Sequence, residues 1–140
     1  MANRTITVDT LINASIEKVW NCWTDTQHLV NWNNAFEDWH TPIAENDVRT
    51  GGRLKLRMEA KDGSAGFDHE AVYDDVIKYE KIKYTTTDGR RSTILFTPTN
   101  DGINVSETFE PEDETPLDVQ KNFVQSILNR FRKYVEDQRD

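Results

Sequence analysis

The chain has 140 residues, a formal net charge of −8 at neutral pH and a single cysteine, Cys22. This length suits one domain with its own core, so we expect residues 1–140 to fold as one unit. The acidic balance argues against nucleic acid and anionic lipid as partners, because both attract basic surfaces. A lone thiol fits a reducing compartment, and no apolar run reaches the ~18 residues of a membrane span. We therefore expect a cytoplasmic protein without membrane insertion, since the first residues also lack the apolar segment of a signal peptide.

The first third of the chain predicts a strand followed by two short helices. Residues 4–12 alternate between apolar and polar side chains, which is typical of a strand. Ser15 is a good N-cap for a short amphipathic helix, and a second helical piece is expected over 26–32. Residues 39–43 should be extended, with Pro42 marking a sheet edge or the end of a strand.

The middle of the chain predicts an antiparallel meander. Asp-Gly pairs at 62–63, 88–89 and 101–102 are strong hairpin signals. The segments around them alternate apolar and polar residues or are rich in β-formers. The expected strands cover 54–58, 67–77, 80–87, 91–97 and 103–110.

The C-terminal part predicts one long amphipathic helix. Thr115 and Pro116 offer a hydroxyl cap and a proline at the first helical position. The helix should run for about 20 residues, or roughly 30 Å. Its broad apolar stripe consists of Phe123, Val124, Ile127, Leu128, Phe131, Tyr134 and Val135.

These elements predict an α+β fold with a ligand cavity. A curved antiparallel sheet of about six strands would wrap around the long helix, because its inner face is the surface available to the apolar stripe. A gap between helix and sheet would be lined by apolar and aromatic side chains with a few polar anchors, although ordinary core packing explains the same residues. The candidate cavity residues are Trp32, Trp39, His40, Leu56, Met58, Phe67, His69, Tyr73, Tyr84, Phe96, Phe109, Phe123, Ile127 and Phe131.

Other chemistry finds little support in the residue pattern. His28, His40 and His69 lack a metal-ligand spacing, so no metal or cofactor is expected. The serines lack the context of a catalytic nucleophile. Glu70 and Glu107 are candidates for buried partners of a basic side chain such as Arg57. The sequence leaves an enzymatic role uncertain and leans against one.

Five stretches together resemble a known superfamily. They read INASIEKVW at 12–20, WNNAFEDWHTP at 32–42, AENDVRTGGRL at 44–54, MEAKDGSAGFDHEAVYDDV at 58–76 and PLDVQKNFVQSILNRFRKYVE at 116–136. The chain resembles the START-like, or SRPBCC, superfamily, and within it the branch named for the activator of the ninety-kilodalton heat-shock protein's ATPase. The resemblance implies a helix-grip fold with a cavity between the long helix and the sheet.

Three functions remain open at this point. The first is a carrier or sensor that binds a small lipophilic or aromatic molecule in the cavity. The second is a protein-interaction module with a chaperone as its partner, for which an acidic exterior suits a basic patch. The third is a cyclase- or hydrolase-like enzyme that uses His69 and Tyr73 as acid–base groups. Ligand binding is the function that we expect.

Overall fold

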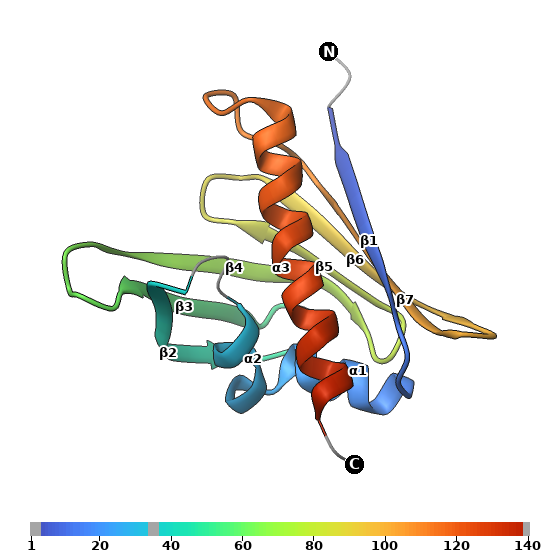
Figure 1. Cartoon of the computed structure of the whole chain (residues 1–140). Helices are drawn as coiled ribbons and strands as arrows, with labels where there is room; N and C mark the ends of the chain where they lie inside the picture. Colours follow the sequence, from blue (N-terminus) through green and yellow to red (C-terminus); the bar gives the residue numbers. More distant parts are fainter. Residues whose placement is uncertain (1–3, 34–36, 139–140) are drawn as a thin grey trace.

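A curved antiparallel sheet wraps around one long C-terminal helix in the computed structural model, which describes residues 4–33 and 37–138 (Figure 1). Two short helices close one end of the sheet. In chain order the elements are β1 (Ile6–Ile12), α1 (Ile16–Thr24), α2 (Thr26–Trp32), β2 (Trp39–Asn46), β3 (Arg53–Ala60), β4 (Gly66–Ile77), β5 (Lys81–Thr86), β6 (Arg91–Thr99), β7 (Gly102–Phe109) and α3 (Leu117–Asp137). Residues 34–36, inside the WNNAFEDWHTP stretch, lie outside the described part.

The sheet is a meander from β2 to β7 that β1 closes at the far edge. Its strand order is β1-β7-β6-β5-β4-β3-β2, and every neighbouring pair is antiparallel. The predicted helix-grip architecture is confirmed, with seven strands instead of about six. The additional strand is β2, because pairing with β3 continues from Trp39 to Asn46. Pro42 lies in this edge strand beside a register shift between His40 and Ile43, where no ladder bond is required of it.

The two short helices begin as predicted from their capping residues. The Ser15 hydroxyl accepts a hydrogen bond from the Lys18 amide at 3.2 Å, which satisfies one of the free donors of α1. Asp25 caps α2 through the Gln27 amide at 3.0 Å. These caps fix the short connection between α1 and α2 and so fix how both helices close the sheet.

The predicted Thr115 cap of α3 is wrong. Pro116 has an extended backbone and occupies the N-cap position, so Thr115 lies outside the helix. The side chain of Gln120 turns back instead, donating to the carbonyl oxygens of Thr115 at 2.7 Å and Glu112 at 3.0 Å. The same side chain accepts from the Glu112 amide at 3.0 Å, so it anchors the preceding loop to the helix.

Burial along α3 changes from one half to the other. Leu128, Phe131 and Val135 are fully buried against the inner face of the sheet and the short helices. The described residues contain no helix that is both long and apolar enough to span a bilayer. In the first half of α3, Leu117 and Val119 are exposed. The core is therefore tight under the second half of α3 and looser under the first, where a cavity forms.

Candidate functional site

A cavity of about 190 Å³ lies between α3, the short helices and the inner face of the sheet. Strands β3, β4, β5 and β7 form its floor, and α1, α2 and α3 form its walls. Most of its lining is apolar or aromatic, which is typical of small-molecule sites. The lining residues are Trp23, Leu29, Trp32, Asn33, Leu54, Leu56, His69, Tyr73, Ile82, Tyr84, Glu107, Val124 and Ile127.

Two tryptophans from the short helices form the aromatic wall. The ring centroids of Trp23 and Trp32 are 4.8 Å apart, and both rings pack edge-on against Phe131 of α3. The Trp32 indole N–H donates to the Cys22 carbonyl at 2.8 Å, which satisfies the polar atom of a buried ring. These contacts hold the wall rigidly at the end of the cavity that α1 and α2 close.

The two cavity tyrosines remain neutral. The Tyr73 hydroxyl donates to the Asn46 side-chain oxygen, and the Asn46 amide donates to the Thr24 carbonyl at 2.9 Å. Burial raises the pKa of Tyr73, and burial together with the nearby charge of Glu107 raises the pKa of Tyr84. The Ser92 hydroxyl forms a hydrogen bond with Tyr84. Both hydroxyls therefore belong to networks that link the sheet to its surroundings.

Glu107 is the one carboxyl among the residues that line the cavity. Its neighbours in the sheet are Val8 of β1 and Ile94 of β6, both buried, so its side chain points to the inner face. No hydrogen bond or ion pair joins its carboxyl to any side chain in residues 4–33 and 37–138. Glu107 is partly buried, and desolvation in these apolar surroundings disfavours its charged form and raises its pKa to about 7. This group is therefore partly protonated at neutral pH.

His69 is the one histidine among the residues that line the cavity. It lies on β4 opposite Leu56 of β3 and is partly buried. Burial is the main cause that lowers its pKa, and the positive charge of Arg90 lowers it further. Asp88 acts in the opposite direction. His69 is consequently neutral at pH 7, and the cavity holds no basic charge among its described residues.

Six predicted cavity residues come together in the structure. They lie on five different elements, and the alternation of the strands accounts for the strand members. The six are Trp32, Leu56, His69, Tyr73, Tyr84 and Ile127.

Three predicted residues fill the core instead of lining the cavity. Phe96 packs against Trp20 and Trp23, with centroids 5.2 and 6.0 Å away. Phe131 is fully buried against the tryptophan wall, and Phe109 is buried near the end of β7. All three face inward as predicted, but none is among the residues that line the hollow.

Phe67 and Phe123 are corrections to the predicted lining, because both are about half exposed. Phe67 is on the inner face, but the β3–β4 hairpin projects beyond the helices (Figure 1). Its ring contacts the Trp39 ring, with the centroids 5.9 Å apart. Phe123 lies about 140° around the helix from the fully buried Leu128, since each residue turns by about 100°. The apolar stripe of α3 is wider than the surface that covers it.

The remaining predicted residues lie near the sheet edge. Trp39 and His40 belong to the edge strand β2 and are partly exposed. Met58 is half-buried, and its sulfur accepts from the Thr41 hydroxyl at 3.2 Å and the Asn33 amide at 3.8 Å. None of the three is among the lining residues.

Leu54 also lines the cavity, on the face that strand alternation predicts for it together with Leu56 and Met58. The sequence did not predict six other lining residues, which are Trp23, Leu29, Asn33, Ile82, Glu107 and Val124. The alternation of β5 and β7 would have placed Ile82 and Glu107 on the inner face. The proposed pairing of Glu70 or Glu107 with Arg57 is wrong. Arg57 bonds Glu59 at 2.9 Å and Asp68 at 3.4 Å on the outer face, and Glu70 lies 3.8 Å from Lys55.

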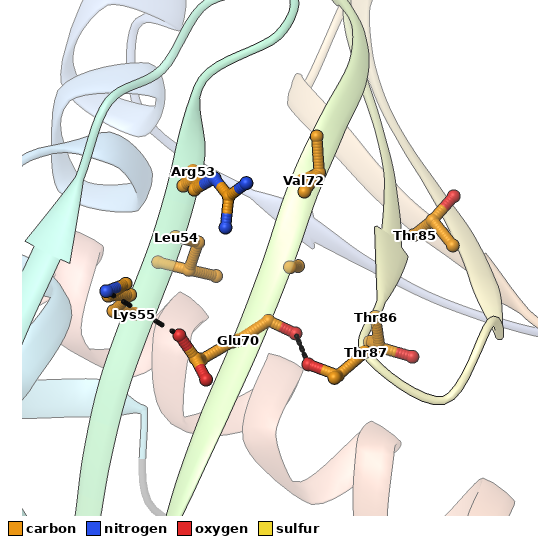
Figure 2. Close-up of a pocket in the computed structure, with 9 residues that line it drawn as sticks. Arg53, Leu54, Lys55, Glu70, Val72, Thr85, Thr86 and Thr87 are labelled. Carbon is orange, nitrogen blue, oxygen red and sulfur yellow. Dashed lines mark hydrogen bonds and ion pairs between the residues drawn. The ribbon is translucent and has the colours of Figure 1, made fainter.

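A second hollow lies on the outer face of the same sheet (Figure 2). It measures about 370 Å³ and spans β3, β4 and β5. Figure 2 shows Lys55 directed toward Glu70, and the Thr87 hydroxyl donates to the Glu70 carbonyl at 3.3 Å. Two of its charged groups, Lys55 and Glu70, thus pair with each other at the surface.

Metal chemistry finds no site in the described ranges. They contain no group of three or more His, Cys, Asp or Glu side chains placed to hold a metal ion.

The family model described as "Activator of Hsp90 ATPase homolog 1-like protein" matches residues 13–136. The chain belongs to this family. The match runs from the end of β1 almost to the end of α3, so it contains every residue that lines the cavity. A comparison with curated proteins gave no match.

Solved structures agree with this assignment. The AHSA1-like protein of Aeromonas hydrophila superposes with a TM-score of 0.90 at 33% identity, over 98% of this chain and 99% of that one. A protein of Cytophaga hutchinsonii has 44% identity and a TM-score of 0.84, over 95% and 92% of the two chains. A Chromobacterium violaceum protein, 23% identical over 96% and 99%, shares the fold with a TM-score of 0.85. The predicted START-like resemblance is confirmed.

Proposed function

We propose that this AHSA1-like protein binds a small lipophilic or aromatic molecule in the inner cavity, as a carrier or sensor. The observation that carries the proposal is the hollow under α3, with aromatic walls and polar groups that converge from separate strands. A filled core would leave no such space, because protein interiors normally pack to the density of organic crystals. An unfilled cavity lowers stability unless a ligand occupies it.

The volume limits what the ligand can be. An engineered apolar cavity of about 150 Å³ accommodates benzene, whereas drug-sized ligands use pockets of about 300–1,000 Å³. At about 190 Å³, the inner cavity suits one ring with a short substituent. Sterols and long acyl chains exceed this volume, so the proposal favours small aromatic compounds over lipids.

A two-dimensional NMR titration tests the proposal. The probes are propylbenzene, a phenol, a flavonoid, a fatty acid and a sterol, observed through the backbone amides and the indole N–H groups of Trp23 and Trp32. We expect saturable shifts with the single-ring probes at both indoles and around Ile127. Absence of saturable shifts with every probe would refute ligand binding.

Ile127→Trp is the variant that blocks the site. Ile127 lines the cavity, so an indole at this position should occupy the space of the ligand and reduce affinity at least tenfold. Val119→Trp is the matched control, because Val119 lies on the same helix and is about half exposed. Equal affinities of the two variants would place the ligand elsewhere.

A chaperone ATPase regulator is the second candidate, and the first half of α3 favours it. Leu117, Val119 and Phe123 leave large apolar side chains at the surface there, and exposed apolar patches mark interaction sites. The family description names activation of the Hsp90 ATPase. The test compares the ATPase rate of an Hsp90-type chaperone with and without the protein, and with Val119→Asp. Stimulation that Val119→Asp abolishes would support this role, and an unchanged rate would refute it.

A further inference from the structure

Glu107 is an unusual group to find in an apolar cavity. Val8 and Ile94 flank it in the sheet, and Ile82 and the indoles of Trp23 and Trp32 share the hollow with it. Glu107 is partly buried, and no side chain within the described ranges forms a hydrogen bond or ion pair with its carboxyl. Carboxyls in apolar surroundings normally have a cation or several hydrogen-bond donors. The hollow leaves this carboxyl open to a bound molecule.

The groups around Glu107 select the kind of partner. No lysine or arginine is among the described residues that line the cavity. Tyr73 is already bonded to Asn46, and Tyr84 is bonded to Ser92. The cavity thus offers one unpaired acidic group and no basic one, so it favours cations and disfavours anions.

The aromatic wall adds to this preference. Indole rings attract cations through their negative faces, with a larger effect where water is excluded. Trp23 and Trp32 line the same cavity as Glu107. The net charge of −8 also raises the local concentration of cationic molecules.

We propose that the inner cavity takes a small aromatic amine, whose ammonium group pairs with the Glu107 carboxylate while its ring packs against Trp23 and Trp32. This inference rests on the proposed ligand-binding function and specifies the chemical class of the ligand. An ammonium ligand would stabilise the ionised carboxyl and release the proton that the free protein holds there.

Three matched probes test the proposal by calorimetry at pH 7: phenethylamine, propylbenzene and phenylacetate. The first two have nearly the same shape and differ in charge, and the third carries the opposite charge. Wild type should bind phenethylamine at least tenfold more tightly than phenylacetate. Glu107→Gln should weaken phenethylamine at least tenfold and leave propylbenzene unchanged.

Glu110→Gln is the control, because Glu110 lies three residues away on the outer face and pairs with Arg91 at 3.1 Å. This variant should leave all three affinities unchanged. A second readout needs no variant: measured in buffers of different ionisation enthalpy, phenethylamine binding at pH 7 should release about half a proton, since the pKa of Glu107 is about 7.

Each outcome decides between the two proposals. Three results would overturn the amine proposal: equal loss of phenethylamine affinity in both variants, no proton release, or tighter binding of phenylacetate. In each case, binding of propylbenzene would still support the cavity proposal. Failure of every probe to bind the wild type would overturn both.

Discussion

Hollows of opposite character lie on the two faces of the sheet. The outer hollow spanned by β3, β4 and β5 is larger than the inner one, at about 370 Å³ against about 190 Å³, yet its Lys55 and Glu70 pair with each other in contact with solvent. The inner hollow is smaller, but it holds a carboxyl without a partner among the described residues, a neutral histidine and two tyrosines among apolar walls. Volume alone therefore does not identify the site.

The carboxyls Glu107 and Glu110 make the same point within one stretch of chain. Arg91 forms a two-point ion pair with Glu110, at 3.1 Å for each contact, and lowers its pKa. Glu107 faces inward, where burial raises its pKa to about 7. Two carboxyls three residues apart in the chain thus differ in kind: Glu110 forms a surface ion pair, whereas Glu107 is available to a ligand.

The largest expected difference between the faces is in packing. Ile94 is fully buried on the inner face, and its neighbour Leu95 is about 40% exposed on the outer face. Ile94→Ala should lower the free energy of unfolding by about 4 kcal/mol, because it removes buried methyl groups and leaves a void. Leu95→Ala should cost less than about 1 kcal/mol. Urea unfolding of both variants measures this, and similar losses would contradict the assigned faces.

The next largest expected effect is a pH dependence of the free energy of unfolding, which arises from Glu107 on the inner face. The folded protein holds the Glu107 proton up to about pH 7, whereas the ordinary pKa of 4.5 applies in the unfolded chain. The folded state therefore binds more protons over this interval, and stability falls as pH rises through it. The free energy of unfolding falls by about 3 kcal/mol at most, and it falls no further once Glu107 is fully ionised above pH 7.

Unfolding of wild type and Glu107→Gln at pH 5 and pH 8 isolates this effect, since their difference cancels the opposing contribution of His69. We expect Glu107→Gln to gain stability relative to wild type between these two values. Glu110→Gln should show no such gain, because Arg91 lowers the pKa of Glu110 and moves its titration to more acidic pH. Parallel pH profiles of wild type and Glu107→Gln would contradict the raised pKa of this carboxyl.

The smallest effect concerns single hydroxyl groups. Tyr73→Phe removes the bond to Asn46 inside the protein and should cost about 1 kcal/mol. Thr85→Val removes a bond from the Thr85 hydroxyl to Asp74 on the outer face, where water can replace it, and should cost less than about 0.5 kcal/mol. Thermal unfolding measures both, and a larger loss for Thr85→Val would reverse the comparison.

Much of the fold follows from local patterns in the sequence. The Asp-Gly turns and the alternation of the strands indicated the meander, and the Ser15 cap indicated the start of α1. The cap of α3 was not predictable in this way, because the Gln120 side chain takes over the role expected of Thr115. Such a substitution depends on how the preceding loop folds back.

The sequence predicts which face of the sheet lines the cavity, but not how far the cavity extends. Strand alternation placed Leu56, Tyr73 and Tyr84 inward, and they line the hollow. Strand alternation does not predict that the β3–β4 hairpin extends beyond the helices, where Phe67 is about half exposed. Glu107 was not predicted to line the cavity, because it was expected to pair with a basic side chain. The assembled sheet shows that no basic side chain among the described residues pairs with it.

The most direct test of ligand binding in the inner cavity is the location of a bound probe by intermolecular nuclear Overhauser effects. The protein carries labelled methyl groups, and propylbenzene is the probe. We predict contacts from its ring to the methyl groups of Leu56, Ile82 and Ile127, which line the inner hollow. Contacts to Val72 in the outer hollow, or none at any methyl group, would contradict the account.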